Sequence, residues 1–318
     1  MGITERIDAI TKIPTEFLAS TLPAPKSVKI EISPRCNYRC GFCALRMRDE
    51  QPTEDMDFDL FKRMTSEMWE AGVEEIGVFF LGESMMNPQL LEKCIRWCKR
   101  DLEFPYVFLT TNGSLATPDR LKACFEAGLD SLKFSINAFD RAQFSEVMAV
   151  SPRWFDKTFT NLAGARRMRD QGKYDCGIYA SSIRFDGEQQ VKMEALLEEH
   201  ILPHVDEHYW LPLYSMGSFA TQREEELGYR PIAGNQGRLG ALREPLPCWS
   251  AFTEGHVRAN GHMSVCCFGA NDVFDIGDLN EMTFMQAWNS PEFMALRQAH
   301  LNKDVTGTVC ENCVAYNG

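Results

Sequence analysis

Residues 28–43 read VKIEISPRCNYRCGFC, in which a short apolar run of β-forming residues leads directly into three cysteines. Cys36, Cys40 and Cys43 therefore share one loop at the end of a predicted strand. Thiolates are soft ligands that suit iron–sulfur clusters, and three of them leave the fourth iron of a [4Fe–4S] cube without a protein ligand. Such an iron can bind a substrate, so the loop predicts a cluster with a catalytic role.

Two other interpretations of this loop stay open. A zinc site usually has a fourth nearby Cys or His, and the next histidine along the chain is His200. Alternatively, the three cysteines are core residues that happen to be close in sequence.

The alternation of strand and helix patterns along the following residues predicts an α/β fold. From Val28 to about Pro212, strand-like runs alternate with helical patterns, as in βα units wound around a parallel sheet. Six such units are too few for a closed eight-stranded barrel, so we expect a partial (β/α)6 TIM-like barrel with its chemistry at the carboxyl ends of the strands. The predicted strands are Val28–Ile32, Glu75–Leu81, Tyr106–Thr110, Ser131–Ile136, Cys176–Ile183 and Val205–Leu211, with helices near 59–71, 88–100, 118–127, 157–171 and 188–200.

Changes in composition divide the chain into four predicted segments. Residues 1–26 are a lead-in, 27–213 the barrel, 214–247 a glycine-containing linker or lid, and 248–318 a small C-terminal module. In that module Asn260-Gly261 separates two strand-like runs, which predicts a β-hairpin whose two turn residues have positive φ. A helix is expected from Thr283 to about His300.

The C-terminal module carries a second cysteine pattern. Twelve residues separate Cys248 from Gly261, four separate Gly261 from Cys266, and the chain ends near Cys310-x-x-Cys313. Four thiolates can converge on a second cluster and leave no open iron, although zinc would fit the same spacing.

Cys267 follows Cys266 directly, and neighbouring residues of a strand point to opposite faces. The spacing assigns Cys266 to the cluster. Cys267 is then either an inert buried thiol or a hydrogen-atom donor that faces the substrate. The remaining cysteines lie in helix or strand patterns and are expected in the core: Cys94, Cys98, Cys124 and Cys176.

The first cysteine loop resembles the signature of the radical S-adenosylmethionine (radical SAM) superfamily, C-x-x-x-C-x-Φ-C, with Phe42 as the aromatic residue. The resemblance implies that the open iron binds S-adenosylmethionine, whose reductive cleavage gives a hydrogen-abstracting 5′-deoxyadenosyl radical. It also implies a low-potential electron donor such as flavodoxin or ferredoxin. The cosubstrate contacts that it implies are Phe42, Gly82, Glu83, Ser84, Thr111, Asn112, Ser135 and Asn137. Leu81 and Ser84 depart from the family's G-G-E-P segment, and each of these residues could instead be a turn-former at a strand end.

The second pattern resembles the SPASM family in its shortened form, the twitch domain, which implies one auxiliary [4Fe–4S] cluster. Similar proteins include an aminocyclitol dehydrogenase and an amino-sugar epimerase, so the resemblance implies oxidation or epimerisation of a small polar substrate. Residues proposed to hold it are Arg153, Arg184, Glu207, His208 and Tyr209. A SPASM enzyme that modifies ribosomal peptides and a non-catalytic iron–sulfur electron carrier remain as alternatives.

Composition argues against other partners. The 318 residues carry a net charge of -12, whereas nucleic-acid binding normally needs a concentrated basic surface. No apolar run approaches the length of a membrane span. The start of the chain lacks the apolar core of a signal peptide, so the many cysteines predict a cytoplasmic metalloprotein rather than a disulfide framework.

Overall fold

The computed structural model describes residues 1–47, 51–216, 231–313 and 315–316. Within them, nine strands form one sheet in the order β6-β5-β4-β3-β2-β1-β7-β8-β9. Strands β1 to β6 pair in parallel with their neighbours, which confirms the predicted partial barrel. Their bounds are β1 Ser27–Ile30, β2 Glu75–Gly77, β3 Tyr106–Thr111, β4 Ser131–Ser135, β5 Gly177–Ile183 and β6 Glu207–Leu211.

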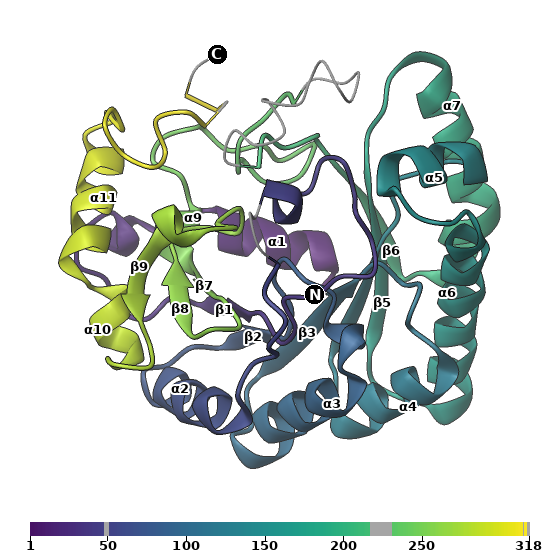
Figure 1. Ribbon diagram of the computed structural model, residues 1–318, viewed down its shortest axis with the longest axis horizontal. Helices are drawn as coiled ribbons and strands as arrows, with labels where there is room; N and C mark the ends of the chain where they lie inside the picture. Colours follow the sequence, from purple (N-terminus) through teal and green to yellow (C-terminus); the bar gives the residue numbers. More distant parts are fainter. Residues whose placement is uncertain (48–50, 217–230, 314, 317–318) are drawn as a thin grey trace.

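The helices between these strands cover the outer side of the curved sheet (Figure 1). They are α2 Phe58–Glu70, α3 Pro88–Arg96, α4 Pro118–Ala127, α6 Arg153–Gly172 and α7 Gly187–Leu196, and a π-helical turn extends both α3 and α7. Two further helices, α1 Ile3–Thr11 and α5 Arg141–Met148, were not expected from the sequence.

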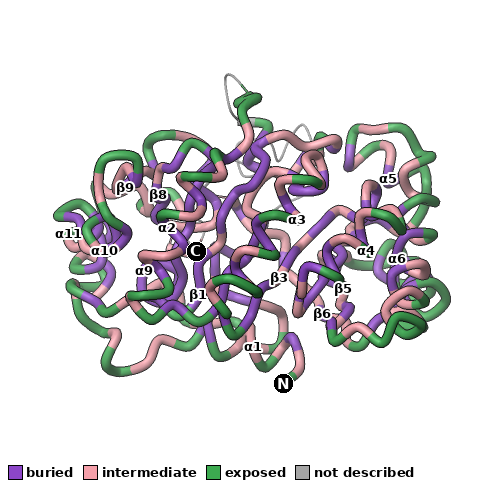
Figure 2. Tube along the Cα trace, turned by 90° about the horizontal axis from the view of Figure 1, so that it is seen from below, coloured by how far each residue is buried: buried purple, intermediate pink, exposed green. Residues whose placement is uncertain are grey.

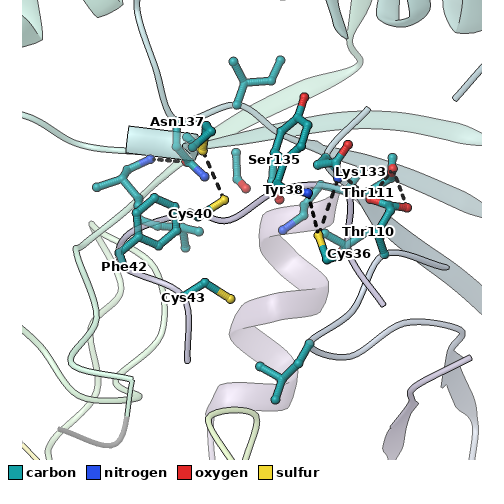
Figure 3. Close-up of a pocket in the computed structure, with 18 of the residues that line it drawn as sticks. Cys36, Tyr38, Cys40, Phe42, Cys43, Thr110, Thr111, Lys133, Ser135 and Asn137 are labelled. Carbon is teal, nitrogen blue, oxygen red and sulfur yellow. Dashed lines mark hydrogen bonds between the residues drawn. The ribbon is translucent and has the colours of Figure 1, made fainter. Parts of the chain in front are cut away.

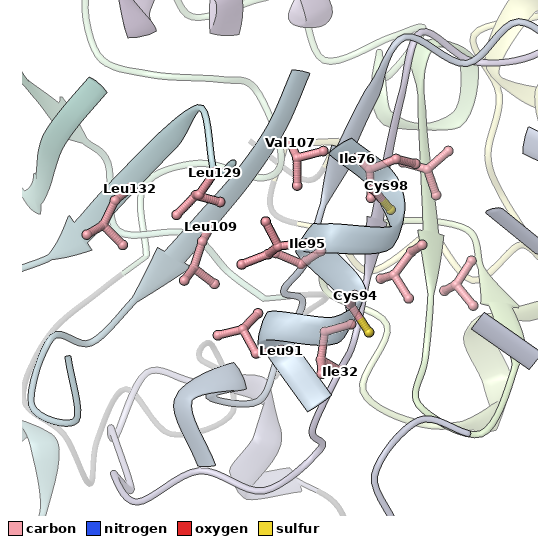
Figure 4. Packing of buried hydrophobic residues seen from close by; sticks show 14 of the residues in the cluster. Ile32, Ile76, Leu91, Cys94, Ile95, Cys98, Val107, Leu109, Leu129 and Leu132 are labelled. Carbon is pink, nitrogen blue, oxygen red and sulfur yellow. The ribbon is translucent and has the colours of Figure 1, made fainter. Parts of the chain in front are cut away.

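Apolar residues of the sheet and of the helices are buried together in one core cluster. Exposed residues lie mostly on the outer turns (Figure 2). Leu91 and Ile95 of α3 pack on Val107 and Leu109 of β3 (Figure 4). Cys94 and Cys98 are buried in the same cluster, as are Cys124 and Cys176, so these four cysteines are core residues as predicted.

Helix α1 lies across the amino ends of the barrel strands. Glu207, the first residue of β6, accepts hydrogen bonds from the backbone N–H of Ile3 (2.8 Å) and from the Thr4 hydroxyl. Arg6 donates to Glu75, the first residue of β2, at 2.9 Å and lies over the ring of Tyr106. The helix therefore forms the floor of the barrel.

The C-terminal module continues the barrel sheet. Strand β7 (Glu254–Val257) pairs in parallel with β1, with Ser27 opposite Glu254. β7, β8 (His262–Ser264) and β9 (Asp275–Asp278) are antiparallel neighbours, so the predicted hairpin is confirmed. Only Gly261 of its turn has a positive φ, +87°, so the expectation for Asn260 was wrong.

Helices α9 (Ser250–Thr253), α10 (Phe284–Trp288) and α11 (Pro291–Leu301) complete the module. The helix expected from Thr283 is thus split, and Ser290 and Pro291 start its second half. Residues 217–230 of the expected linker or lid, with Gly217 and Gly228, lie outside the described residues. Across the described chain, no helix is both long enough and apolar enough to cross a membrane.

Candidate active site

The loop that carries Cys36, Cys40 and Cys43 leaves the carboxyl end of β1 and is held from two sides. On one side, the backbone N–H groups of Arg39 and Gly41 donate to the last turn of α5, at 3.0 and 2.8 Å. On the other, the Asn112 side chain after β3 donates to the Asn37 side chain at 2.9 Å. Helix α5, which the sequence did not reveal, is therefore part of the support for the three cysteines.

The segment after β2 crosses directly over the same loop. The Gly82 N–H donates to Glu31 at 3.2 Å and the Glu83 N–H to the Arg35 carbonyl at 2.8 Å. A Cβ at Gly82 would lie 1.9 Å from the Ser33 carbonyl oxygen, so no side chain fits there. Glycine at this position is required by the close approach of two backbones.

A cavity of about 330 Å³, here named the upper cavity, opens at the carboxyl ends of the strands. Cys36, Cys40 and Cys43 line it, with their sulfur atoms turned toward the same space (Figure 3). Burial, and then the Glu83 carboxylate, raise the pKa of Cys36 to about 12, and burial also raises the pKa of Cys40. Buried thiols with raised pKa values become thiolates only beside a cation, which the irons of a cluster supply.

Seven of the eight residues expected around the cosubstrate line this cavity: Phe42, Gly82, Glu83, Thr111, Asn112, Ser135 and Asn137. Ser84 does not line it. Its hydroxyl is buried and donates to the Val78 carbonyl at 2.7 Å, so the cavity gives no support to the role expected for Ser84, which stays a prediction.

Glu83 is the acidic residue of this wall. Its carboxylate accepts hydrogen bonds from the Thr111 hydroxyl at 3.0 Å and from the backbone N–H groups of Asn112 (2.8 Å) and Met85 (3.0 Å). Burial raises its pKa, and these hydrogen bonds oppose the rise. The carboxylate is therefore fixed in one orientation at the edge of the cavity.

A second cavity of about 210 Å³, the lower cavity, lies between the upper cavity and α1. Lys133, Phe79, Tyr214, Cys267 and Phe268 are among the residues that line both cavities. Sequence reasoning missed Lys133, although a lysine in the otherwise apolar stretch Leu132–Phe134 was a signal that it faces a cavity.

The predicted ligands of the auxiliary cluster meet around a third, smaller space, the C-terminal cavity. Cys248, Cys266, Cys310 and Cys313 all line it. A Cβ at Gly234 would lie 2.5 Å from the Cys313 sulfur, so the linker backbone packs directly on this site. Burial raises the pKa of Cys248 to about 11. Within the described residues, no three Cys, His, Asp or Glu side chains lie close enough together to hold a single metal ion. The four thiols therefore line one cavity without meeting at a single point.

The structure separates the two adjacent cysteines. Cys266 lines the C-terminal cavity, whereas Cys267 lines the upper and lower cavities. Both lie in the turn after β8 rather than on a strand, so the expected strand geometry was wrong, although the opposite orientation that it predicted is present.

Most of the residues expected to hold a substrate lie away from the upper and lower cavities. Arg153 and Arg184 are exposed, Glu207 binds α1, and the His208 ring bonds to the Ser182 hydroxyl at 3.1 Å. None of these four lines the upper or lower cavity, so the two cavities give no support to the role expected for them. Tyr209 lines the lower cavity.

Comparison with known proteins agrees with this geometry. Residues 30–191 match the Radical SAM superfamily. The chain belongs to the radical SAM superfamily. Residues 248–314 match SPASM, an iron–sulfur cluster-binding domain, which decides between iron–sulfur and zinc in the C-terminal module. The radical SAM domain implies S-adenosylmethionine and a [4Fe–4S] cluster, and the SPASM domain indicates auxiliary iron–sulfur clusters, as the sequence predicted.

Curated relatives match only in part. An S-adenosylmethionine-dependent nucleotide dehydratase of Oncorhynchus mykiss is 29% identical over 134 residues, 42% of this chain and 37% of that protein. GTP 3′,8-cyclase of Chlorobaculum tepidum is 32% identical over 123 residues, 38% of this chain and 35% of that protein. The chain thus spans little more than a third of the length of these relatives.

Solved structures show the same fold over most of this radical SAM enzyme. BtrN in complex with AdoMet and 2-DOIA has a TM-score of 0.60 at 16% identity and covers 91% of this chain and 92% of that one. Streptococcus suis SuiB bound to its precursor peptide SuiA has a TM-score of 0.65 at 13% identity, over 93% and 71% of the two chains.

Proposed function

We propose that this radical SAM enzyme oxidises or epimerises a small polar substrate, such as an aminocyclitol or an amino sugar, in the upper cavity. Cys36, Cys40 and Cys43 are the proposed ligands of the catalytic cluster. The proposed ligands of the auxiliary cluster are Cys248, Cys266, Cys310 and Cys313. S-adenosylmethionine bound at the catalytic cluster supplies a 5′-deoxyadenosyl radical, which abstracts hydrogen from an unactivated C–H bond. The barrel is assigned to residues 27–213 and the twitch domain to residues 248–318.

The observation that carries this proposal is the placement of Cys266 and Cys267. Cys266 lies with the other C-terminal cysteines, whereas Cys267 lies in the wall of the upper cavity. A single peptide bond therefore joins the auxiliary site to the place where a substrate would react. This arrangement suits both an electron acceptor for oxidation and a hydrogen-atom donor for epimerisation.

The upper cavity also suits a small molecule. Its volume of about 330 Å³ and its mostly apolar walls with a few polar groups are typical of ligand pockets. Ser135 and Asn137, at the end of β4, contribute polar groups to the wall. The side-chain oxygen of Asn137 accepts a hydrogen bond from the Ile183 backbone N–H at 3.0 Å, so the side-chain amide is fixed in orientation.

Cys267 is the proposed hydrogen-atom donor of an epimerase. The thiol S–H bond breaks as a C–H bond forms on the opposite face of the substrate radical, and one electron and one proton then restore the thiol. In an oxidation the substrate radical instead gives up one electron and one proton, and Cys267 keeps its hydrogen. The two outcomes differ in product mass.

The test is anaerobic incubation of the reconstituted enzyme with S-adenosylmethionine, dithionite and a panel of aminocyclitols and amino sugars. Formation of 5′-deoxyadenosine and the mass of the substrate are followed together, in water and in deuterium oxide. An epimer should gain one deuterium, because a thiol exchanges with solvent, whereas an oxidised product should be lighter by two hydrogens. If no 5′-deoxyadenosine forms, the radical reaction is wrong; if it forms and no panel member changes, the substrate class is wrong.

Two cysteine variants separate the possible outcomes. For an epimerase, Cys267→Ala should keep both clusters and still form 5′-deoxyadenosine, but lose the epimer. Cys124→Ala, which removes a buried thiol of the core, is the matched control and should keep turnover. Loss of an auxiliary cluster in Cys267→Ala would show that Cys267 rather than Cys266 is the ligand.

A further inference from the structure

Lys133 lies at the junction of the two cavities in the barrel. It is the central residue of β4, on the same face as Ser135, whose side chain lines the upper cavity. Lys133 lines the lower cavity as well, and Ser135 does not. The lysine therefore lies two residues closer than Ser135 to the amino end of β4, and so deeper in the barrel than that residue.

Lys133 forms no ion pair within the described part of the chain. Among the described residues that line the upper cavity, Glu83 and Lys133 are the only Asp, Glu, Lys or Arg side chains. The Glu83 carboxylate is already bound by Thr111 and by two backbone N–H groups. Lys133 has no hydrogen bond or ion pair to an acidic group in the described part of the chain, and its ammonium nitrogen lies over the Tyr209 ring, 5.7 Å from the ring centroid.

The other cations of the lower cavity are each paired. Arg6 binds Glu75 at 2.9 Å, Lys29 binds Glu254 at 2.8 Å, and Arg238 binds Asp8, which lies outside the cavity wall, at 2.6 Å. These pairs neutralise every basic residue of the wall except Lys133. Among the described residues that line the two cavities, Lys133 is thus the one lysine or arginine without an ion pair.

An unpaired cation inside a protein is unfavourable, because the interior solvates charge poorly. Burial, and then the nearby charge of Lys29, lower the pKa of Lys133 to about 7. An anion in the cavity would supply the missing charge and a charge-assisted hydrogen bond. The cavity is thus suited to a ligand that carries an acidic group.

We propose that Lys133 binds a carboxylate or phosphate group of the substrate and so selects an acidic small molecule, such as a sugar acid or a sugar phosphate. This inference rests on the proposed radical reaction of a small polar substrate in the upper cavity, and it favours an acidic substrate over the amino compounds named there. The acidic group lies deep in the barrel, between β4 and Cys267, and the rest of the substrate extends toward the strand ends. Lys133 thereby fixes which carbon faces the cosubstrate.

The experiment measures binding rather than turnover. Isothermal titration calorimetry is run anaerobically on the cluster-loaded enzyme with S-adenosylmethionine bound, using glucuronate, glucose 6-phosphate and glucose as probes. The three share one ring and differ in the acidic group. At least one acid should bind and glucose should not. The two acids distinguish a carboxylate site from a phosphate site.

Variants assign the binding to Lys133. Lys133→Met should weaken binding of the acid by about tenfold or more, the worth of one hydrogen bond to a charged group. Lys133→Arg, which keeps the charge, should retain most of the affinity. Lys157→Met removes an exposed lysine of α6 and should change nothing.

Several results would overturn the inference. They are equal binding of glucose and the acids, no binding of either acid, or unchanged binding to Lys133→Met. A matching loss of S-adenosylmethionine affinity in Lys133→Met would assign the lysine to the cosubstrate instead. Cleavage of S-adenosylmethionine by dithionite is measured on the same samples. Its absence in the wild type would refute the proposed function, whereas its presence without acid binding would refute only the role of Lys133.

Discussion

Replacing Glu254 with glutamine should destabilise the barrel through Lys29. The Glu254 side chain on β7 is 4% exposed, and one of its oxygens accepts from Lys29 at 2.8 Å and from the His256 ring at 2.9 Å. Glutamine keeps the shape and removes the negative charge. Lys29 would then be an uncompensated cation in the same space as Lys133.

The pKa of Glu254 gives the size of the effect. Burial alone would raise this pKa, but the charge of Lys29 and the His256 hydrogen bond lower it from 4.5 to about 2. At about 1.4 kcal/mol per pKa unit, the shift corresponds to about 3 kcal/mol, within the range for breaking a buried ion pair. At about 2 cal/mol/K of unfolding entropy per residue, a chain of this length should lose about 5 °C of melting temperature.

The effect also has a defined pH range. Because the folded-state pKa lies below the unfolded one, the stabilisation is complete above pH 4.5 and is lost as the pH falls toward 2. The assay at pH 7 therefore measures the whole contribution.

The assay is thermal unfolding followed by circular dichroism under anaerobic conditions, at matched iron content. Glu92→Gln, in the exposed pair with Arg96, is the control and should change the melting temperature by less than about 1 °C. The double variant Lys29→Met/Glu254→Gln should recover much of the loss, because it removes both charges. A melting temperature unchanged in Glu254→Gln, or a double variant as unstable as the single one, would refute the reasoning.

Three further predictions concern the cluster and the cavity. Replacing Cys36, Cys40 and Cys43 with alanine should leave about half of the roughly eight irons per chain and abolish 5′-deoxyadenosine, as measured by iron assay and chromatography. Gly82→Ala should reduce both iron retention and S-adenosylmethionine affinity, because its Cβ meets the Ser33 carbonyl, whereas Gly164→Ala, with nothing within 4 Å, should not. Lys133→Met should raise the melting temperature below pH 7, because it removes a buried charge. The gain should shrink from pH 7 to pH 10.5: over this range residue 133 of the wild type is neutral in the folded chain and protonated in the unfolded chain, so wild-type stability rises with pH.

Much of the barrel could be predicted from local patterns. Buried parallel strands are short apolar runs between turn residues. Each of the six predicted runs overlaps an observed strand, and four contain it whole; β1 begins one residue earlier than predicted, at Ser27, and β3 ends one residue later, at Thr111. Helix α1 has Ile3, Ile7 and Ile10 at helical spacing, so a signal was present, but its role as a floor depends on Glu207 and Glu75, which are far away in sequence. Helix α5 has eight residues, too few for periodicity to distinguish it from a loop.

The cysteines of the candidate site were predictable because ligand spacing is local. The hydrogen bonds that hold their loop could not be predicted, because they join it to α5 and to Asn112, which only the fold brings close. Arg184 and His208 were chosen for their chemistry alone. The sequence does not reveal that Arg184 follows the end of β5 and is exposed, or that the His208 ring contacts Ser182. Lys133 could have been chosen from the same sequence by its even spacing from Ser135.

The parallel pairing of β1 with β7 has a consequence for engineering. Exchanging the C-terminal module with that of a relative is one way to change the reaction. Residue 248, the predicted start of the module, would be the obvious junction. Such a graft would remove the strand that covers one edge of β1, together with Glu254, the partner of Lys29. A chimera should keep residues 254–257 of this chain, or import β1 together with the new module, if the sheet is to stay paired at β1 and the cysteine loop after β1 is to keep its position.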